Sequence, residues 1–191
     1  MKKLRIAFVA LLAYGTLFAG TYSLDIAHSS VGFKIKHMMI SNVQGQFNKF
    51  TGTFDYNRAT KTLKSLEGKI DIASIDTKVK KRDADLRSSN FFDVAKYPTM
   101  TFVMDKIKDG TMYGKLTMHG ITKEIKLEFE INGTLTDPWG NVRTGISLNG
   151  KINREDFGLK WNKIIEAGGV LVGKTVKINI ELEGILAKQK G

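Results

Sequence analysis

Two short motifs in the 191-residue chain contain residue types that elsewhere bind phosphate or carry a nucleophile. Residues 168–175 read GGVLVGKT and match the P-loop pattern, in which a helix follows the glycine-rich loop so that its amides hold phosphate. Here Thr175 begins a run with the period of a strand, and only sixteen residues follow it. Residues 145–150 read GISLNG and resemble a nucleophile elbow, but the last motif position is not Gly and Ser147 lies in mid-strand. We interpret the first motif as a glycine hairpin and expect neither nucleotide hydrolysis nor serine-hydrolase chemistry.

The titratable residues form no pattern typical of a catalytic or metal site. Cysteine is absent, which excludes disulfides, iron–sulfur clusters, zinc–thiolate sites and cysteine nucleophiles. His28, His37 and His119 show no metal-ligand spacing, and Asp83 and Asp85 diverge on a predicted helix. The sequence therefore predicts a protein that is not an enzyme and that carries no metal ion or other cofactor.

The first nineteen residues have the pattern of a signal peptide. Lys2, Lys3 and Arg5 form a positive region, and an uncharged apolar run over residues 6–18 follows them. Ala19 offers a small residue for cleavage, although the residue two before it is a leucine. The apolar run is shorter than the ~20 residues that span a bilayer, which favours cleavage near Ala19 over an uncleaved anchor.

Export restricts the partners of this basic chain. The formal net charge is +11, and loss of residues 1–19 leaves 27 basic and 19 acidic residues, a net charge of +8. An exported protein rarely meets nucleic acid. We therefore predict a periplasmic domain over residues 20–191, whose charge suits an anionic lipid, peptidoglycan or an anionic small molecule.

Most of that domain alternates apolar and polar residues with the period of β-strands. The alternating runs are 31–35, 66–72, 100–104, 112–118, 125–131, 146–152 and 176–183. Turn signals separate them at Asp109-Gly110, His119-Gly120, Asn132-Gly133 and 137–140. The Asn132 sequon is explained by such a hairpin turn without glycosylation.

Helix is scarce in this pattern, and the number of strands favours closure. Residues 77–90 are the one good helix candidate, with Asp76 as its cap, and a short turn is expected near 27–30. About eight to ten antiparallel strands in one meander are expected to close, because closure removes exposed edges. An eight-stranded barrel has an interior wide enough for one small ligand or for its own side chains.

The apolar faces of the predicted strands are rich in long and aromatic side chains. The chain contains seven Met and eleven Phe, and Met adapts to irregular shapes. One interpretation is a deep apolar tunnel for a chain-like lipid. The other is a plain packed barrel core, and the pattern does not distinguish the two.

Eight short segments, taken in order, carry a more specific signal. They read LDIAHSSVGF (24–33), GQF (45–47), SIDT (74–77), RDADLRSSNFFD (82–93), KYP (96–98), GKLTMHGIT (114–122), NREDFG (153–158) and GVLVG (169–173). This order is very similar to that of the YceI family, also described as lipid- or polyisoprenoid-binding domains. The resemblance covers about residues 21–186, essentially the whole of the predicted mature chain.

The resemblance implies an all-β fold: an extended, lipocalin-like antiparallel eight-stranded barrel with a short helix covering one side. It implies a long apolar ligand in the barrel, such as a polyisoprenoid, an isoprenoid quinone or a fatty amide. It also implies export to the periplasm, and homodimers occur in the family. The chain departs from the family pattern at Lys174-Thr175, where acidic residues are common, and at Asp85, where His is common. Both departures bear on head-group preference or on a partner surface.

We expect the hydrocarbon of such a ligand to contact one set of inward-facing residues. This set comprises Phe33, Ile35, Phe47, Phe54, Phe102, Met104, Leu116, Met118, Phe129 and Leu148. Residues 86–92 are a candidate lid through Leu86, Phe91 and Phe92, and the polar head is expected near Arg87, Asn90 or Arg154.

The function that the sequence predicts is a periplasmic binding or carrier protein for a long-chain apolar ligand, with transient contact to a membrane surface. Two alternatives stay open. One is a stress-related interaction protein whose barrel is filled by its own side chains. The other is an enzyme that acts on a lipid-like substrate, which needs a convergent polar cluster inside the tunnel.

Overall fold

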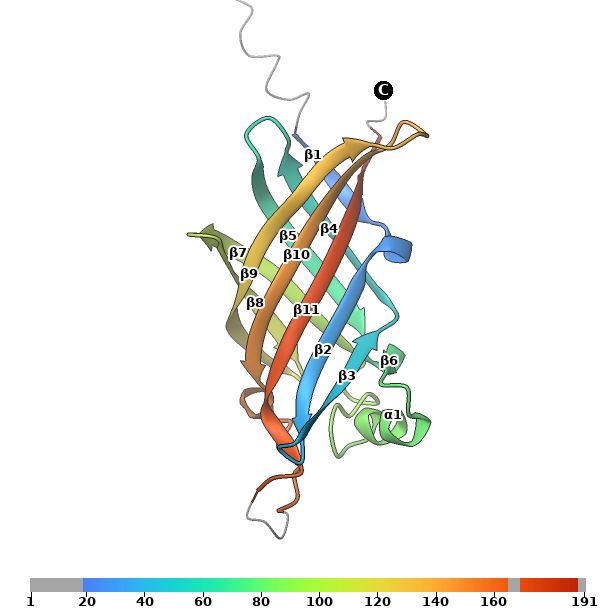
Figure 1. Ribbon diagram of the computed structural model, residues 1–191, viewed down its shortest axis with the longest axis vertical. Helices are drawn as coiled ribbons and strands as arrows, with labels where there is room; N and C mark the ends of the chain where they lie inside the picture. Colours follow the sequence, from blue (N-terminus) through green and yellow to red (C-terminus); the bar gives the residue numbers. More distant parts are fainter. Residues whose placement is uncertain (1–18, 165–168, 189–191) are drawn as a thin grey trace, which may run out of the picture.

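The computed structural model describes residues 19–164 and 169–188, which form a closed antiparallel β-barrel with one short α-helix (Figure 1). Eight strands close the ring, each hydrogen-bonded to the next and the last to the first: β1 (Ala19–Leu24), β4 (Phe50–Asn57), β5 (Thr62–Asp71), β7 (Thr99–Lys108), β8 (Thr111–Met118), β9 (Ile121–Thr136), β10 (Val142–Asn153) and β11 (Val172–Leu186). The predicted eight-stranded barrel is confirmed. The described part of the chain contains no helix that is both long enough and apolar enough to cross a membrane.

The predicted signal peptide lies outside the described residues except for Ala19. That residue opens β1, where it pairs with Asn57 of β4. Removal of residues 1–19 would leave the rest of β1 paired with β4 from Gly20 onward and with β11 from Tyr22 onward.

One edge of β11 is shared by two strands. The end of β11 pairs with β1, while Val172–Glu181 pairs with β2 (Ser30–His37). A 3-10 turn, η1 (Ile26–His28), separates β1 from β2 in the expected place, and the Asp25 carboxylate caps it by accepting the Ala27 amide. From β2 the sheet continues through β3 (Ser41–Phe47) to the short β6 (Ile75–Asp76), which extends one end of the barrel.

Helix α1 (Lys80–Arg87) lies beside β6 at that end and is shorter than the predicted helix over 77–90 (Figure 1). Asp76 does not cap it, because its carboxylate accepts the Lys78 amide instead. Lys78 has φ +64°, a left-handed conformation that keeps the chain out of the helix until Lys80. Two further 3-10 turns, η2 (Ile72–Ser74) and η3 (Arg154–Phe157), follow β5 and β10.

The hairpin turn predicted at Asn132-Gly133 is wrong. Strand β9 runs through both residues, and the register with β10 shifts next to Gly145, opposite Gly133. Gly133 has φ +143°, which a β-bulge can use and which favours Gly over other residues. The chain reverses instead at 137–141, where the Asp137 carboxylate accepts the amides of Trp139 and Asn141.

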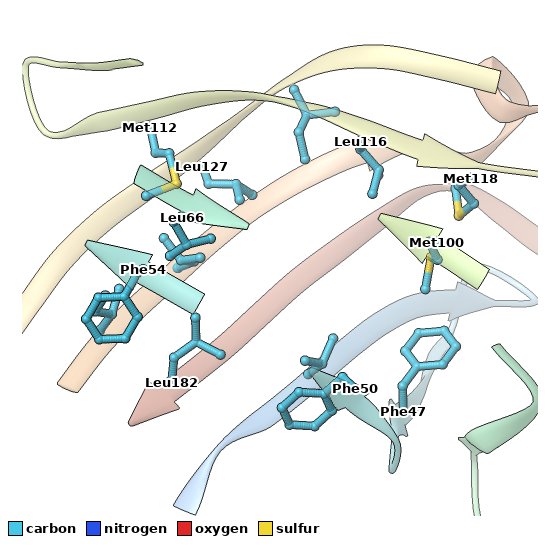
Figure 2. Packing of buried hydrophobic residues seen from close by; sticks show 14 of the residues in the cluster. Phe47, Phe50, Phe54, Leu66, Met100, Met112, Leu116, Met118, Leu127 and Leu182 are labelled. Atoms are coloured by element: carbon cyan, nitrogen blue, oxygen red, sulfur yellow. The ribbon is translucent and has the colours of Figure 1, made fainter. Parts of the chain in front are cut away.

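The hydrophobic core is packed tightly at the end of the barrel away from α1. Tyr22 and Phe54 stack there with ring centroids 4.9 Å apart, and Tyr56 meets Tyr22 edge-on at 6.3 Å. All three rings are buried, and we call them the aromatic plug. Gly184 of β11 makes room for it, because a Cβ there would lie 2.3 Å from the Phe54 ring. Figure 2 shows Phe54 beside Leu66 and Leu182, with Phe47, Met100 and Met118 farther along the interior.

Candidate functional site

The barrel interior is hollow between the aromatic plug and the end that carries α1. The cavity has a volume of about 340 Å³. Its apolar lining comes from most of the strands and from the segments beside α1: Leu24, Val31, Phe33, Ile35, Val43, Phe47, Phe50, Leu66, Ile70, Leu86, Phe91, Phe92, Met100, Phe102, Leu116, Met118, Ile125, Leu127, Leu148, Ile152, Leu159, Trp161, Leu171, Val172, Val176, Ile178, Ile180 and Leu182. The volume falls at the lower end of the range for small-molecule sites.

Alternation along the strands supplies this lining. On β11 the residues Val176, Ile178, Ile180 and Leu182 all face the cavity, over about 20 Å of strand at ~3.3 Å per residue. The polar residues between them face outward. The same rule places pairs from neighbouring strands side by side on the wall, as the Phe102↔Leu116 pairing shows.

A glycine on β5 keeps part of the cavity open. Gly68 lies between Leu66 and Ile70 and shares their inward face. A Cβ built there would meet only one atom within 4 Å, the Thr51 carbonyl oxygen at 3.7 Å. The space over Gly68 is therefore unfilled by neighbouring side chains, in contrast to Gly114, whose inward face is covered by the Phe102 ring.

The two ends of the cavity differ. Leu66 pairs with Phe54 of the aromatic plug, so the cavity ends just below that stack. At the other end the lining includes Lys36, His37 and Val172, which lie where β2 ends and β11 begins. The rings of Phe91 and Trp161 meet there at 5.0 Å, one from the segment after α1 and one from the segment after η3.

Arg154 is the most deeply buried charged residue that lines the cavity, with 3% of its surface exposed. Its guanidinium donates hydrogen bonds to the carbonyl oxygens of Gly173, Leu159 and Val172, and no carboxylate accepts from it among the described residues. Burial lowers the pKa of Arg154 from its usual value, although the group stays charged at neutral pH. The side chain thus anchors the segment after η3 to β11 and leaves a positive charge at the cavity wall.

Two other arginines fix α1 against the barrel. Arg82 donates to the hydroxyl and to the carbonyl oxygen of Thr77, both at 2.7 Å. The buried Asp83 carboxylate accepts the Thr77 amide at 2.9 Å and the Thr77 hydroxyl. Arg87 donates to the carbonyl oxygens of Ala73 and Ile75. These bonds turn Leu86 of α1 toward the cavity.

The structure brings eleven of the sixteen residues expected at the ligand site to the cavity wall. They are Phe33, Ile35, Phe47, Leu86, Phe91, Phe92, Phe102, Leu116, Met118, Leu148 and Arg154. Their contact with a ligand stays a prediction.

The other five of the sixteen residues lie off the wall. Phe54 belongs to the aromatic plug, and Met104 and Phe129 pack against the core beyond Phe102 and Leu127 on their strands. The Arg87 guanidinium is held by backbone carbonyls, and the Asn90 amide donates to the Asp85 carboxylate at 3.0 Å. These two polar residues therefore have structural partners near α1.

Sequence reasoning missed several residues of the wall. The β11 set of Val176, Ile178 and Ile180 stood out by its alternation, but that alternation alone did not assign it to the ligand site. Gly68 carries no apolar signal, and Trp161 lies in no alternating run. Only the closed barrel shows that all five line one cavity.

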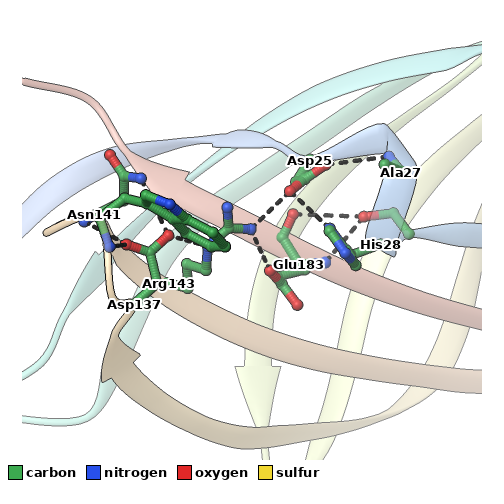
Figure 3. A network of polar contacts seen from close by, with 9 residues as sticks. Asp25, Ala27, His28, Asp137, Asn141, Arg143 and Glu183 are labelled. Carbon is green, nitrogen blue, oxygen red and sulfur yellow. Dashed lines mark hydrogen bonds and ion pairs between the residues drawn. The ribbon is translucent and has the colours of Figure 1, made fainter.

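The remaining titratable cluster lies away from the cavity wall, around Arg143 (Figure 3). Its guanidinium pairs with Asp25 at 2.6 Å, Asp137 at 2.7 Å and Glu183 at 2.5 Å. Hydrogen bonds from Arg143 and then from His28 lower the pKa of Asp25 to about 2. Burial alone would raise the pKa of Asp137, but its hydrogen bonds, first from Arg143, hold it well below the usual range.

Asp25, His28 and Glu183 place possible metal-ligand atoms within 4.8 Å of one another. The Arg143 guanidinium already pairs with both of these carboxylates, so it supplies the positive charge that a metal ion would bring. His37 lines the cavity, and the His119 ring contacts the Phe157 carbonyl. The three histidines therefore lie in three different places and do not form one cluster. The cluster around Arg143 ties η1, β10, β11 and the 137–141 turn together.

The motifs that resemble enzyme signatures have structural roles where they are described. Thr175 lies inside β11, so the residues after the Gly-Lys-Thr sequence form a strand and not a phosphate-binding helix. Gly168 of that motif lies outside the described residues. Ser147 sits in mid-β10, and its hydroxyl bonds to the Glu181 carboxylate and the Asn132 amide rather than to a histidine.

Comparison with known proteins gives a consistent picture. The chain is 36% identical to UPF0312 protein SAS2572 of Staphylococcus aureus over 163 residues, which is 85% of this chain and 95% of that protein. It is 38% identical to UPF0312 protein SERP2314 of Staphylococcus epidermidis over 163 residues, again 85% of this chain and 95% of that protein.

Solved structures with this architecture extend the comparison. The YceI protein of Campylobacter jejuni is 39% identical with a TM-score of 0.69, over 86% of this chain and 97% of that one. A polyisoprenoid binding domain from Saccharophagus degradans shares the fold at 18% identity and a TM-score of 0.64, over 87% of this chain and 98% of that one. The YceI-like domain matches residues 22–184, and the chain belongs to the YceI family.

Proposed function

We propose that the protein binds a single long-chain apolar ligand in its barrel cavity and carries it through the periplasm. The observation that carries the proposal is the cavity of about 340 Å³, which is lined almost wholly by apolar side chains. A protein interior is normally packed to the density of an organic crystal, so an apolar space of this size is unusual unless something fills it.

The shape of the cavity favours an extended chain over a compact ligand. Spread over about 20 Å of β11, the volume corresponds to a mean cross-section of about 17 Å². Each methylene group that enters gains about 0.8 kcal/mol, so a dozen give roughly 10 kcal/mol before the several kcal/mol lost on immobilisation. The end of the chain would reach the aromatic plug.

The head group of the ligand belongs at the opposite end. Polar side chains gather there on Arg154, Arg82, His37, Lys36 and Asp85, while the side chains near the plug are mainly apolar. A head group that accepts hydrogen bonds suits this end. The name of the Saccharophagus degradans domain supports a polyisoprenoid, and an isoprenoid quinone or a fatty amide has the same general form.

The polar contacts of the arginines at the cavity wall support a binding function rather than a catalytic one. Arg154 and Arg82 are engaged with backbone carbonyls and with Thr77, which is a structural use of both side chains. The proposed periplasmic location rests on the signal-peptide pattern of residues 1–19.

Native mass spectrometry of the protein purified from its own periplasm tests the proposal directly. We expect a stoichiometric extra mass that extracts into organic solvent as a long-chain lipid. A bare protein mass that stays bare after polyisoprenoids, quinones and fatty amides are offered would contradict the carrier function.

A further inference from the structure

The end of the barrel beside α1, opposite the aromatic plug, presents apolar side chains to solvent. Met39 is 57% exposed and Ile40 is 83% exposed in the turn between β2 and β3, and Ile164 is 86% exposed in the segment before β11. We call Met38, Met39, Ile40 and Ile164 the apolar tip. Large apolar side chains that gather on one surface usually mark an interaction site.

Backbone hydrogen bonds hold the two parts of the apolar tip together. The Met38 amide donates to the Leu171 carbonyl at 2.9 Å, and the Leu171 amide donates to the Lys163 carbonyl at 2.9 Å. Ile164 also forms a bridge with Val170. The apolar tip is therefore one surface, built from segments that are more than a hundred residues apart in sequence. It lies at the end of the barrel beside α1 (Figure 1).

The turn between β2 and β3 has methionines at two positions with a left-handed backbone conformation. Met38 has φ +49° and Met39 has φ +63°, and the Ile40 amide donates to the His37 carbonyl. Turns with two such residues favour Asn and Gly, because other side chains crowd the backbone there. Exposed methionines at both positions contribute little to the core, so folding does not account for them.

Lysines flank the apolar tip. Lys36, Lys160 and Lys163 are all exposed, and none pairs with a carboxylate among the described residues. By contrast, Lys174 on the neighbouring β11 pairs with Glu155 at 3.1 Å. Stretches 34–44 and 158–164 contain no Asp or Glu, and the next acidic residue along the chain, Glu166, lies outside the described residues. Exposed apolar side chains and nearby lysines are the two signals that together hold a protein on an anionic membrane.

The tip also adjoins the cavity. Lys36 and His37 line the cavity and precede Met38 directly, and Leu171 lines it and accepts the Met38 amide. We propose that the apolar tip docks on an anionic lipid bilayer, which turns this end of the cavity toward the membrane. The docking is inferred from the apolar tip and its neighbouring lysines alone. The transfer of a lipid between membrane and cavity rests in addition on the function proposed above.

Co-sedimentation of the exported protein with lipid vesicles tests the docking. We expect tighter binding to vesicles that contain phosphatidylglycerol than to phosphatidylcholine vesicles, and weaker binding as salt rises. Lys160→Gln with Lys163→Gln removes two charges that do not line the cavity, and should weaken binding about fivefold per lysine. Ile40→Ser should weaken it about tenfold.

A matched control lies at the other end of the barrel. Leu135, near the β9–β10 turn, is 61% exposed, and Leu135→Ser should leave vesicle binding unchanged. Equal binding to both kinds of vesicle, or equal losses from Ile40→Ser and Leu135→Ser, would overturn the proposal. So would self-association without vesicles that Ile40→Ser abolishes, because the tip would then be an interface between copies. Lipid content measured on the same variants separates the two proposals, since Ile40→Ser should keep a bound ligand.

Discussion

Filling the space over Gly68 tests whether the cavity holds the ligand. The Cβ of a new side chain has room, with its nearest neighbour 3.7 Å away, and the backbone of Gly68 is not in the left-handed region. In Gly68→Leu the added side chain would occupy the space of about three or four methylene groups of ligand. At about 0.8 kcal/mol for each, affinity should fall by about 3 kcal/mol, or roughly 100-fold, whereas Gly68→Ala should lose only about fourfold.

The fold should tolerate this change, because a β-branched or aliphatic residue suits a strand better than glycine does. We expect the melting temperature of both variants to equal or exceed that of the parent. The assay is displacement of a fluorescent fatty acid, together with the mass of lipid that co-purifies. Val103→Phe is the matched control, since Val103 lies on β7 next to Phe102, the Cα partner of Gly68, but is 51% exposed. A folded Gly68→Leu variant that binds lipid as tightly as the parent would refute the placement of the ligand.

Three further changes probe the rest of the structure. Gly184→Ala would press a methyl group against Phe54 and should destabilise the fold by about 1–3 kcal/mol in urea unfolding; an unchanged midpoint would contradict the plug geometry. Met118→Asp should abolish lipid uptake, because an unpaired carboxylate would be buried in the apolar wall; a well-folded variant with normal uptake would argue against the site. Arg143→Met leaves the Asp25 carboxylate without its main partner and should lower the free energy of unfolding at neutral pH. The pKa of Asp25 is lowered from 3.8 to about 2, so the parent should lose this stability as pH falls from about 4 to 2, and urea unfolding of Arg143→Met should show little of that slope.

Much of the fold follows from local pattern. The period of two in runs such as 125–131 and 176–183 predicts strands that the structure contains, because alternate residues of a strand face opposite sides. Strands β3 and β4 were not among the predicted runs. Glycines and polar residues interrupt the apolar pattern there, at Gly45 and Gly52 for example, and tertiary pairing decides their conformation.

Turn and capping motifs in the sequence predicted the ends of helices and strands less reliably. The Asn132-Gly133 pair is a strong hairpin signal, yet pairing of β9 with β10 across a bulge overrides it. The predicted start of the helix was wrong because the Asp76 carboxylate accepts a hydrogen bond from the Lys78 amide. The start of α1 is instead held by the hydrogen bonds between Thr77 and Asp83. Both errors arise where a side chain has several possible hydrogen-bond partners and the rest of the fold selects one.

The sequence alone determined the family, the closed barrel and many of the residues that face inward, because strand alternation and motif order can be read from local sequence. Whether the interior is filled or hollow was decided only by tertiary structure. Phe54 fills the room left by Gly184 at one end, while no side chain fills the room over Gly68, two residues along β5 from Leu66. Side chains reach such spaces across the barrel, from strands that are far apart in sequence. The apolar tip likewise exists only because hydrogen bonds join the Met38 turn to the segment around Leu171.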